Sequence, residues 1–187
     1  MTAAYFGVES YVPLALVEER GLSAGAAGLA LTGAALAWFG GSWVVAHPGG
    51  FGRLLATPRR RVTLGGAAVV VGLTAGLLVL VPAVPVVVIL LTWAVGGLGM
   101  GAATAGSSVQ VLALSPPGQE GATSAAMQTN DAIAESTVLA LGAVVFAAML
   151  PVGLAPALLT VIGATLAVVG LVGVLWLPRG WTRGAPA

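Results

Sequence analysis

The chain has 187 residues, of which 58% are hydrophobic and only 7% are charged, and its mean hydropathy is +1.05. These values exclude an ordinary soluble domain, in which about a quarter of the residues are charged. No charged residue occurs between Val62 and Gln119, a stretch that no solvent-facing surface would tolerate. Because the chain has no cysteine, disulfides and thiolate chemistry are excluded as well.

Six membrane spans are predicted along the chain, because a helix needs about 20 apolar residues to cross the bilayer core. We predict them at about 3–17, 24–46, 62–81, 86–112, 122–150 and 156–177, separated by charged, proline-rich or glycine-rich turns. The first of these is short for a span. The predicted fold class is therefore an all-α polytopic membrane helix bundle, one six-span unit over residues 1–178 with a tail over 179–187.

The arginines predict how the bundle is oriented. One group follows the second span and another follows the sixth, and with six spans both lie on the same side: Arg53, Arg59, Arg60, Arg61, Arg179 and Arg183. The opposite loops contain only Arg20, which two glutamates accompany. The positive-inside rule then predicts a multi-pass protein of the plasma membrane with both termini in the cytoplasm.

The fifth predicted span carries a stripe of polar residues. Ser124, Gln128, Asp131 and Glu135 are spaced i, i+4, i+7 and i+11, so they share one face of a helix. Acidic side chains inside a membrane are costly and usually face a path for ions or substrate. Since Asp131 and Glu135 are one turn apart, at least one of them should stay protonated near neutral pH. In the simpler alternative, Asp131 hydrogen-bonds a neighbouring helix and has no transport role.

A third acid, Glu9, lies in the short first span, one turn before Pro13, which permits a bend. Glu9 is a candidate proton site, or an interfacial residue if this span is not inserted. Gln128, Asn130 and Trp93 are candidate contacts in a substrate cavity, although packing also explains Trp93. His47 stands alone, so no metal site is predicted.

Glycines are frequent in the fourth span, where Gly97 and Gly101 form a small-xxx-small pair. Such pairs let two membrane helices approach closely. A nucleotide-binding interpretation fails, because this glycine cluster lies in an uncharged span with no strand before it. We therefore expect close helix packing.

In the order of its short motifs, the chain resembles the C-terminal half of a major facilitator superfamily transporter, in particular actinobacterial multidrug-efflux-like members. The motifs that carry the resemblance are Glu9, Tyr11-Val-Pro-Leu14, Arg20-Gly-Leu-Ser23, Gly28-Leu-Ala-Leu-Thr32, Gly41-Ser-Trp43, Gly99-Met-Gly101 and Ser115-Pro-Pro-Gly-Gln-Glu-Gly121. The resemblance implies spans seven to twelve of a twelve-span transporter, built as two inverted three-helix repeats. In the loop after the second span, the acid usual in that family is missing.

Together, the acids and the resemblance lead us to expect half of a secondary transporter that exports small amphipathic compounds by proton-coupled alternating access. Glu9, Asp131 and Glu135 are the expected proton or cation sites. The expected partners are the lipid bilayer, protons, a small-molecule substrate, and either an N-terminal six-span half or a second copy, with no nucleic acid. An upstream half lost by truncation would explain the short first span.

Two other classes compete with this interpretation. The chain can instead be a degenerate or non-transporting half that binds another membrane protein. An intramembrane enzyme is disfavoured, because no activated nucleophile, metal cluster or phosphate-binding loop is present in the sequence. We therefore expect no enzymatic activity and no cofactor.

Overall fold

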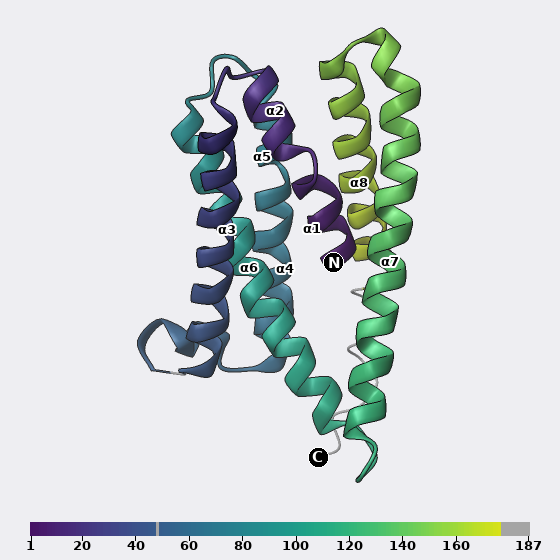
Figure 1. The fold of residues 1–187 in the computed structure, drawn as a ribbon. Helices are drawn as coiled ribbons and strands as arrows, with labels where there is room; N and C mark the ends of the chain where they lie inside the picture. The colour runs from purple at the N-terminus through teal and green to yellow at the C-terminus, as the bar shows by residue number, and fades with distance from the viewer. Residues whose placement is uncertain (48, 177–187) are drawn as a thin grey trace.

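The structure, a computed structural model, describes residues 1–47 and 49–176. Within these residues the regular elements are all helices, joined by short turns (Figure 1). In chain order they are α1 (Thr2–Glu9), α2 (Val12–Glu18), α3 (Ala24–Ala46), the 3₁₀ helix η1 (Gly50–Leu55), α4 (Pro58–Leu73), α5 (Ala75–Leu78), α6 (Val86–Ala113), α7 (Glu120–Met149), the 3₁₀ helix η2 (Leu150–Val152) and α8 (Leu154–Trp176).

Five stretches of helix are long and apolar enough to cross a membrane: Ala24–Ala46, Pro58–Leu78, Val86–Ala113, Glu120–Val152 and Leu154–Leu171. The expectation of an all-helical chain that can pass a membrane several times is thus confirmed. The predicted tail over 179–187, with Arg179 and Arg183, lies outside the described residues.

The segment predicted as the first span differs from the other five. It forms two short helices, α1 and α2, of 8 and 7 residues. At 1.5 Å per residue each is only about 10–12 Å long, well short of a bilayer core. Pro13 explains the break, since it has no backbone N–H to donate to the Glu9 carbonyl. The turn forms just before it, where the Tyr11 N–H donates to the Val8 carbonyl over 3.0 Å.

The helix of the third predicted span, α4, begins earlier than the predicted residue 62. Thr57 caps α4, its side chain accepting a hydrogen bond from the Arg60 N–H over 3.3 Å, and Pro58 is the first helical residue. Both are favourable at a helix start. As a consequence Arg59, Arg60 and Arg61 belong to the first turn of α4 and not to a loop.

Glycines bring the backbones of α3, α4 and α6 into contact. A Cβ atom added to Gly65 of α4 would lie 2.8 Å from the Gly99 carbonyl oxygen of α6. Added to Gly97 or Gly101 of α6, it would collide with the Ala34 or Trp38 carbonyl of α3. The expectation that this glycine cluster serves close helix packing is confirmed, and α6 is the helix that α3 and α4 share.

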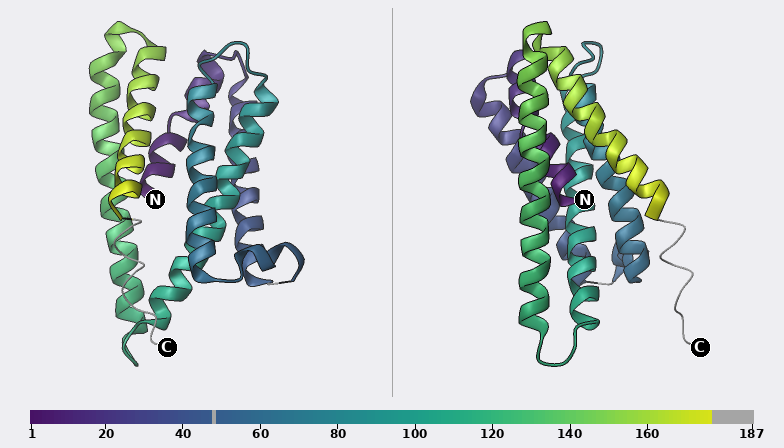
Figure 2. Two further views of the ribbon diagram at one scale, coloured as in Figure 1. Left: turned by 180° about the vertical axis from the view of Figure 1, so that it is seen from behind. Right: turned by 90° about the vertical axis from the view of Figure 1, so that its right-hand side faces the viewer.

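The helices form two groups with α1 between them. The first group contains α3, α4 and α6, and the second is the pair α7 and α8; views from two sides agree on this arrangement (Figures 1 and 2). The largest fully buried side chains include Tyr5, Leu16, Leu73, Trp93 and Ile162, drawn from α1, α2, α4, α6 and α8. By contrast, α7 has no fully buried residue. This exposed helix carries the predicted polar stripe.

Candidate functional site

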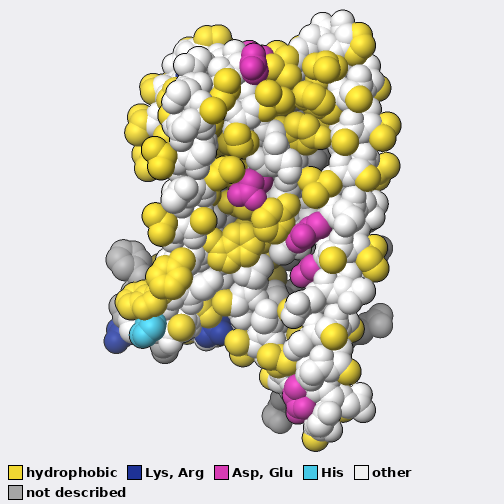
Figure 3. Space-filling view, in the orientation of Figure 1, with side chains coloured by type: hydrophobic (Ala, Val, Ile, Leu, Met, Phe, Trp, Pro, Cys, Tyr) yellow, Lys and Arg dark blue, Asp and Glu magenta, His cyan; other side chains and the backbone are white. Residues whose placement is uncertain are grey.

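The three predicted coupling acids are all half-buried and lie on two elements that touch. Glu9 ends α1, while Asp131 and Glu135 lie one turn apart in α7. In the space-filling view, acidic side chains occupy the middle of the face where α1 lies beside α7 (Figure 3). The structure therefore brings together the two elements that carry these acids.

Asp131 is tied directly to α1. The Thr2 hydroxyl donates a hydrogen bond to Asp131 Oδ1 over 3.3 Å. This distance is long for a hydroxyl donor, whose bonds are commonest near 2.7–2.8 Å. The bond to a neighbouring helix, expected under the simpler reading of Asp131, is present in the structure. It leaves the second carboxylate oxygen available for other contacts.

Three contacts show that α1 and the turn after it run beside α7 in the same direction. Thr2 meets Asp131, a Cβ on Gly7 would lie 2.7 Å from Val138 Cγ1, and the rings of Tyr11 and Phe146 are 5.1 Å apart. From one pair to the next, the residue number increases in both segments, so the two segments run parallel. Since Glu135 falls between Asp131 and Val138, it lies on the part of α7 that α1 accompanies.

The open side of α1 is a stripe of Thr2, Phe6 and Glu9. These residues are spaced i, i+4 and i+7, so they share one face of the helix. All three are half-buried, whereas Ala3, Ala4, Tyr5, Gly7 and Val8 are buried. This stripe is continuous with the polar stripe of α7 through the bond from Thr2 to Asp131. Thr2 and Phe6 were not predicted as site residues, although their spacing from Glu9 is visible in the sequence.

Aromatic rings line the core beside this stripe. Phe6 of α1 and Trp38 of α3 are half-buried, with ring centroids 5.9 Å apart. Tyr5 packs edge-on against both rings and stacks on Trp93 of α6 at 4.8 Å. The open face therefore combines carboxylates with two half-buried aromatic surfaces, those of Phe6 and Trp38.

Trp93 lies behind this face. Only 1% of its surface is exposed, and Tyr5 covers its ring. Neither the Trp93 indole nitrogen nor the Tyr5 hydroxyl has a hydrogen-bond partner among the described residues. Unpaired buried polar atoms are uncommon and destabilising in folded proteins. The stacked pair therefore places two polar atoms in the core for which the described residues supply no hydrogen-bond partner.

The other two predicted cavity residues are not gathered around Trp93. Gln128 and Asn130 are exposed on α7, whereas Trp93 is buried in α6. Gln128 continues the stripe of Asp131 one turn toward the start of α7, and Asn130 lies to its side. Any substrate that touches Gln128 would therefore meet the exposed surface of α7, on which the stripe lies.

A hollow of about 220 Å³ lies between α1, α7 and α8, and its walls are almost entirely apolar. Ala4, Val138, Gly142, Val161, Thr165 and Val169 contribute to them. The Thr165 hydroxyl donates to the Val161 carbonyl of its own helix over 2.9 Å. None of the three candidate coupling acids lines this hollow. It is separate from the acidic face.

No family model, no curated protein and no solved structure matches the chain. The resemblance to major facilitator transporters accordingly stays a prediction from the short motifs.

Metal ligation has no evident place in this arrangement. Among the described residues, no group of three or more His, Asp or Glu side chains is placed to hold a metal ion. His47 stacks on Trp43 with centroids 4.3 Å apart, and its Nδ1 lies 3.0 Å from the Trp43 carbonyl oxygen. The chemistry that the described site offers is therefore proton binding by carboxylates beside aromatic rings.

Proposed function

We propose that this chain forms one half of a secondary active transporter that exports small amphipathic compounds by proton-coupled alternating access. The observation that carries the proposal is the continuous stripe from Glu9 and Phe6 through Thr2 to Asp131 and Glu135, on two packed helices of an apolar chain. Acidic side chains inside an apolar membrane bundle are rare and usually mark a path for ions or substrate, and a carboxyl group is a suitable proton carrier.

The surroundings of the acids suit an amphipathic substrate. Phe6 and Trp38 offer half-buried aromatic surface close to Glu9. Aromatic faces attract cations and accept apolar groups, and carboxylates pair with cations. Competition between a proton and a substrate for the same carboxylates couples their movements in opposite directions.

In this proposal α1 and α2 together count as the first of six spans, arranged as two inverted three-helix repeats. Both termini face the cytoplasm, because the arginines of η1 and α4 lie on that side of the plasma membrane. The second wall of the substrate path comes from an N-terminal six-span half or from a second copy of the chain. The lipid bilayer, protons and a small-molecule substrate complete the set of partners.

The test is proton-driven transport by the full chain in proteoliposomes, with ethidium as a cationic amphipathic probe and a pH-sensitive dye inside. We expect a pH gradient to drive ethidium movement, and E135Q to abolish it while the protein stays in the membrane. E120Q is the matched control, because Glu120 is an exposed acid in the first turn of the same helix, whereas Glu135 is half-buried. Unchanged transport by E135Q would remove Glu135 from the mechanism.

A second candidate function is a non-transporting subunit that binds another membrane protein. Large apolar side chains are exposed on α7, including Ile133 at 63%, Leu141 at 62% and Val144 at 68%. A partner helix would cover these side chains as well as lipid does. Substrate-dependent flux from the purified chain alone would contradict this second function.

A further inference from the structure

Positive charge is concentrated at one end of the bundle, in the segment that joins α3 to α4. Arg53 lies in η1, and Arg59, Arg60 and Arg61 lie in the first turn of α4. The sequence has no acidic residue between Gly21 and Gln119. Glu120, at the start of α7, accepts a hydrogen bond from the nearby Gly118 N–H over 3.2 Å. The charge of this segment is thus not balanced by acids of its own.

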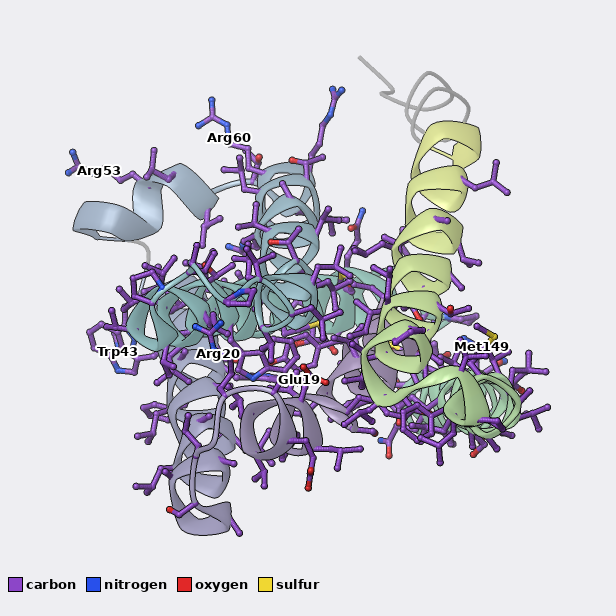
Figure 4. All side chains as sticks on the ribbon, turned by 90° about the horizontal axis from the view of Figure 1, so that it is seen from above. Glu19, Arg20, Trp43, Arg53, Arg60 and Met149 are labelled. Atoms are coloured by element: carbon purple, nitrogen blue, oxygen red, sulfur yellow. The ribbon has the colours of Figure 1, made fainter. Side chains whose placement is uncertain are left out.

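The segment is held in place by the least exposed of these arginines. Arg61 Nε donates to the Leu55 carbonyl over 2.7 Å, which ties the end of η1 to α4. Its side chain also packs on α6, because a Cβ on Gly106 would lie 2.7 Å from Arg61 Cβ. Arg53 and Arg60 are exposed. Viewed along the bundle, both side chains project sideways beyond the helices (Figure 4).

Apolar side chains are exposed at the same end. Leu54, next to Arg53, is 57% exposed, and Trp43, in the last turn of α3, is 54% exposed. Tryptophan is enriched at the level of the lipid headgroups. An apolar side chain beside a cationic one suits the membrane interface, where acyl chains and anionic headgroups meet. The exposed leucine and tryptophan thus suit a location of this end of the bundle at the level of the headgroups.

We infer that Arg53, Leu54 and Arg60 form a binding edge for anionic phospholipids, with each guanidinium group facing phosphate oxygens of the headgroups and Leu54 among the acyl chains. Guanidinium groups bind phosphate oxygens through paired N–H donors. Basic clusters beside a membrane helix attract anionic headgroups. An anion here also offsets the unfavourable position of three arginines at the positive end of the α4 dipole.

This binding edge goes beyond the proposed transport and does not depend on it. Its residues lie in η1 and α4, whereas the candidate coupling acids lie in α1 and α7. The experiment measures lipid binding and not transport. The test uses the full-length chain in detergent micelles, with dioleoyl phosphatidylglycerol and dioleoyl phosphatidylcholine added in equal amounts. Native mass spectrometry then gives the apparent Kd for each lipid. The variants are R53Q/R60Q and R53K/R60K, and the matched control is R179Q/R183Q, which removes the same charge from the C-terminal tail.

We expect wild-type protein and the control variant to retain phosphatidylglycerol in preference to phosphatidylcholine. R53Q/R60Q should bind phosphatidylglycerol roughly tenfold more weakly, and R53K/R60K should keep most of the preference. Equal weakening in R53Q/R60Q and R179Q/R183Q would overturn the inference, since only total charge would then matter. Displacement of the lipid by excess inorganic phosphate would overturn it too, in favour of a free-anion site.

Discussion

Thr2 and Asp131, which are 129 residues apart, join the first helix of the chain to the helix that carries the polar stripe, by a single hydrogen bond of 3.3 Å from the Thr2 hydroxyl to Asp131 Oδ1. The bond makes two half-buried stripes into one. It also gives Asp131 a structural role that is independent of any proton it carries. The two roles can be separated by substitution.

We expect T2V to lower the free energy of unfolding by about 0.6 kcal/mol, the average for hydrogen bonds between membrane helices. The loss should stay below about 2 kcal/mol. D131N keeps an acceptor oxygen and should cost no more. The measurement is unfolding by sodium dodecyl sulfate in mixed micelles, for both single variants and the double variant. T160V is the matched control, because Thr160 donates only to the Pro156 carbonyl of its own helix. If T2V is as stable as the wild-type protein, the bond contributes nothing.

Arg20 provides a second long-range connection. Its Nη1 donates to the Val81 carbonyl over 2.8 Å, and its Nη2 donates to the Val84 carbonyl. The arginine is placed for this by Gly21, whose φ of +67° ends α2 in a left-handed turn that glycine adopts without strain. The α2–α3 turn is thereby fixed to the turn before α6.

R20Q should therefore lower the free energy of unfolding by about 1.5–3 kcal/mol, as expected for hydrogen bonds from a charged donor. R20K, which has a single ammonium in place of the planar fork, should recover only part of the loss. Thermal unfolding in detergent measures both. The neighbouring E19Q serves as control, since Glu19 is exposed (Figure 4). Equal stability of R20Q and E19Q would show that the connection is not energetically important.

Several elements could be predicted from sequence because local signals determine them. Pro85 and a long apolar run placed the fourth span at 86–112, and the helix is Val86–Ala113. The same holds for α3, which covers the predicted 24–46. The predicted start of α4 was wrong, because the run of arginines at 59–61 was interpreted as part of a loop. Thr57 and Pro58 are nevertheless ordinary start signals for a helix.

Which residues come together at the site is determined by contacts between helices, and a single sequence does not reveal these contacts. Trp93 and Gln128 both suit a cavity by residue type, yet one is buried under Tyr5 and the other is exposed. Their burial is set by which helices pack together, and no local pattern encodes that. The partner of Asp131 was equally invisible, because Thr2 is distant in sequence. The stripe itself was predictable, since spacing alone defines a helix face.

Two helical glycines should respond oppositely to the same substitution. G65A places a Cβ 2.8 Å from the Gly99 carbonyl oxygen, so α4 must move away from α6. We expect a loss of about 1–3 kcal/mol, as for other overpacked sites. Gly28 of α3 has open space around it. G28A should be neutral or stabilising by up to about 1 kcal/mol, because alanine has the higher helix propensity.

Unfolding by sodium dodecyl sulfate in mixed micelles compares these two variants directly. Because both change glycine to alanine inside a helix, the difference between them isolates the close approach of α4 to α6. Wild-type stability of G65A would mean that these two helices do not depend on backbone contact at Gly65.

The stacked pair of Tyr5 and Trp93 allows a last test, of a buried hydroxyl with no partner among the described residues. Removing an unpaired polar atom from the core relieves a desolvation penalty, so Y5F should match or exceed wild-type stability. W93A, which removes a large ring from the core, should cost about 3–5 kcal/mol. Thermal unfolding of the two variants in detergent measures both effects. A clear loss of stability in Y5F would show that the hydroxyl is hydrogen-bonded in the membrane. If Y5F instead keeps its stability but loses proton-driven ethidium transport, the Tyr5 hydroxyl serves the site and not the fold.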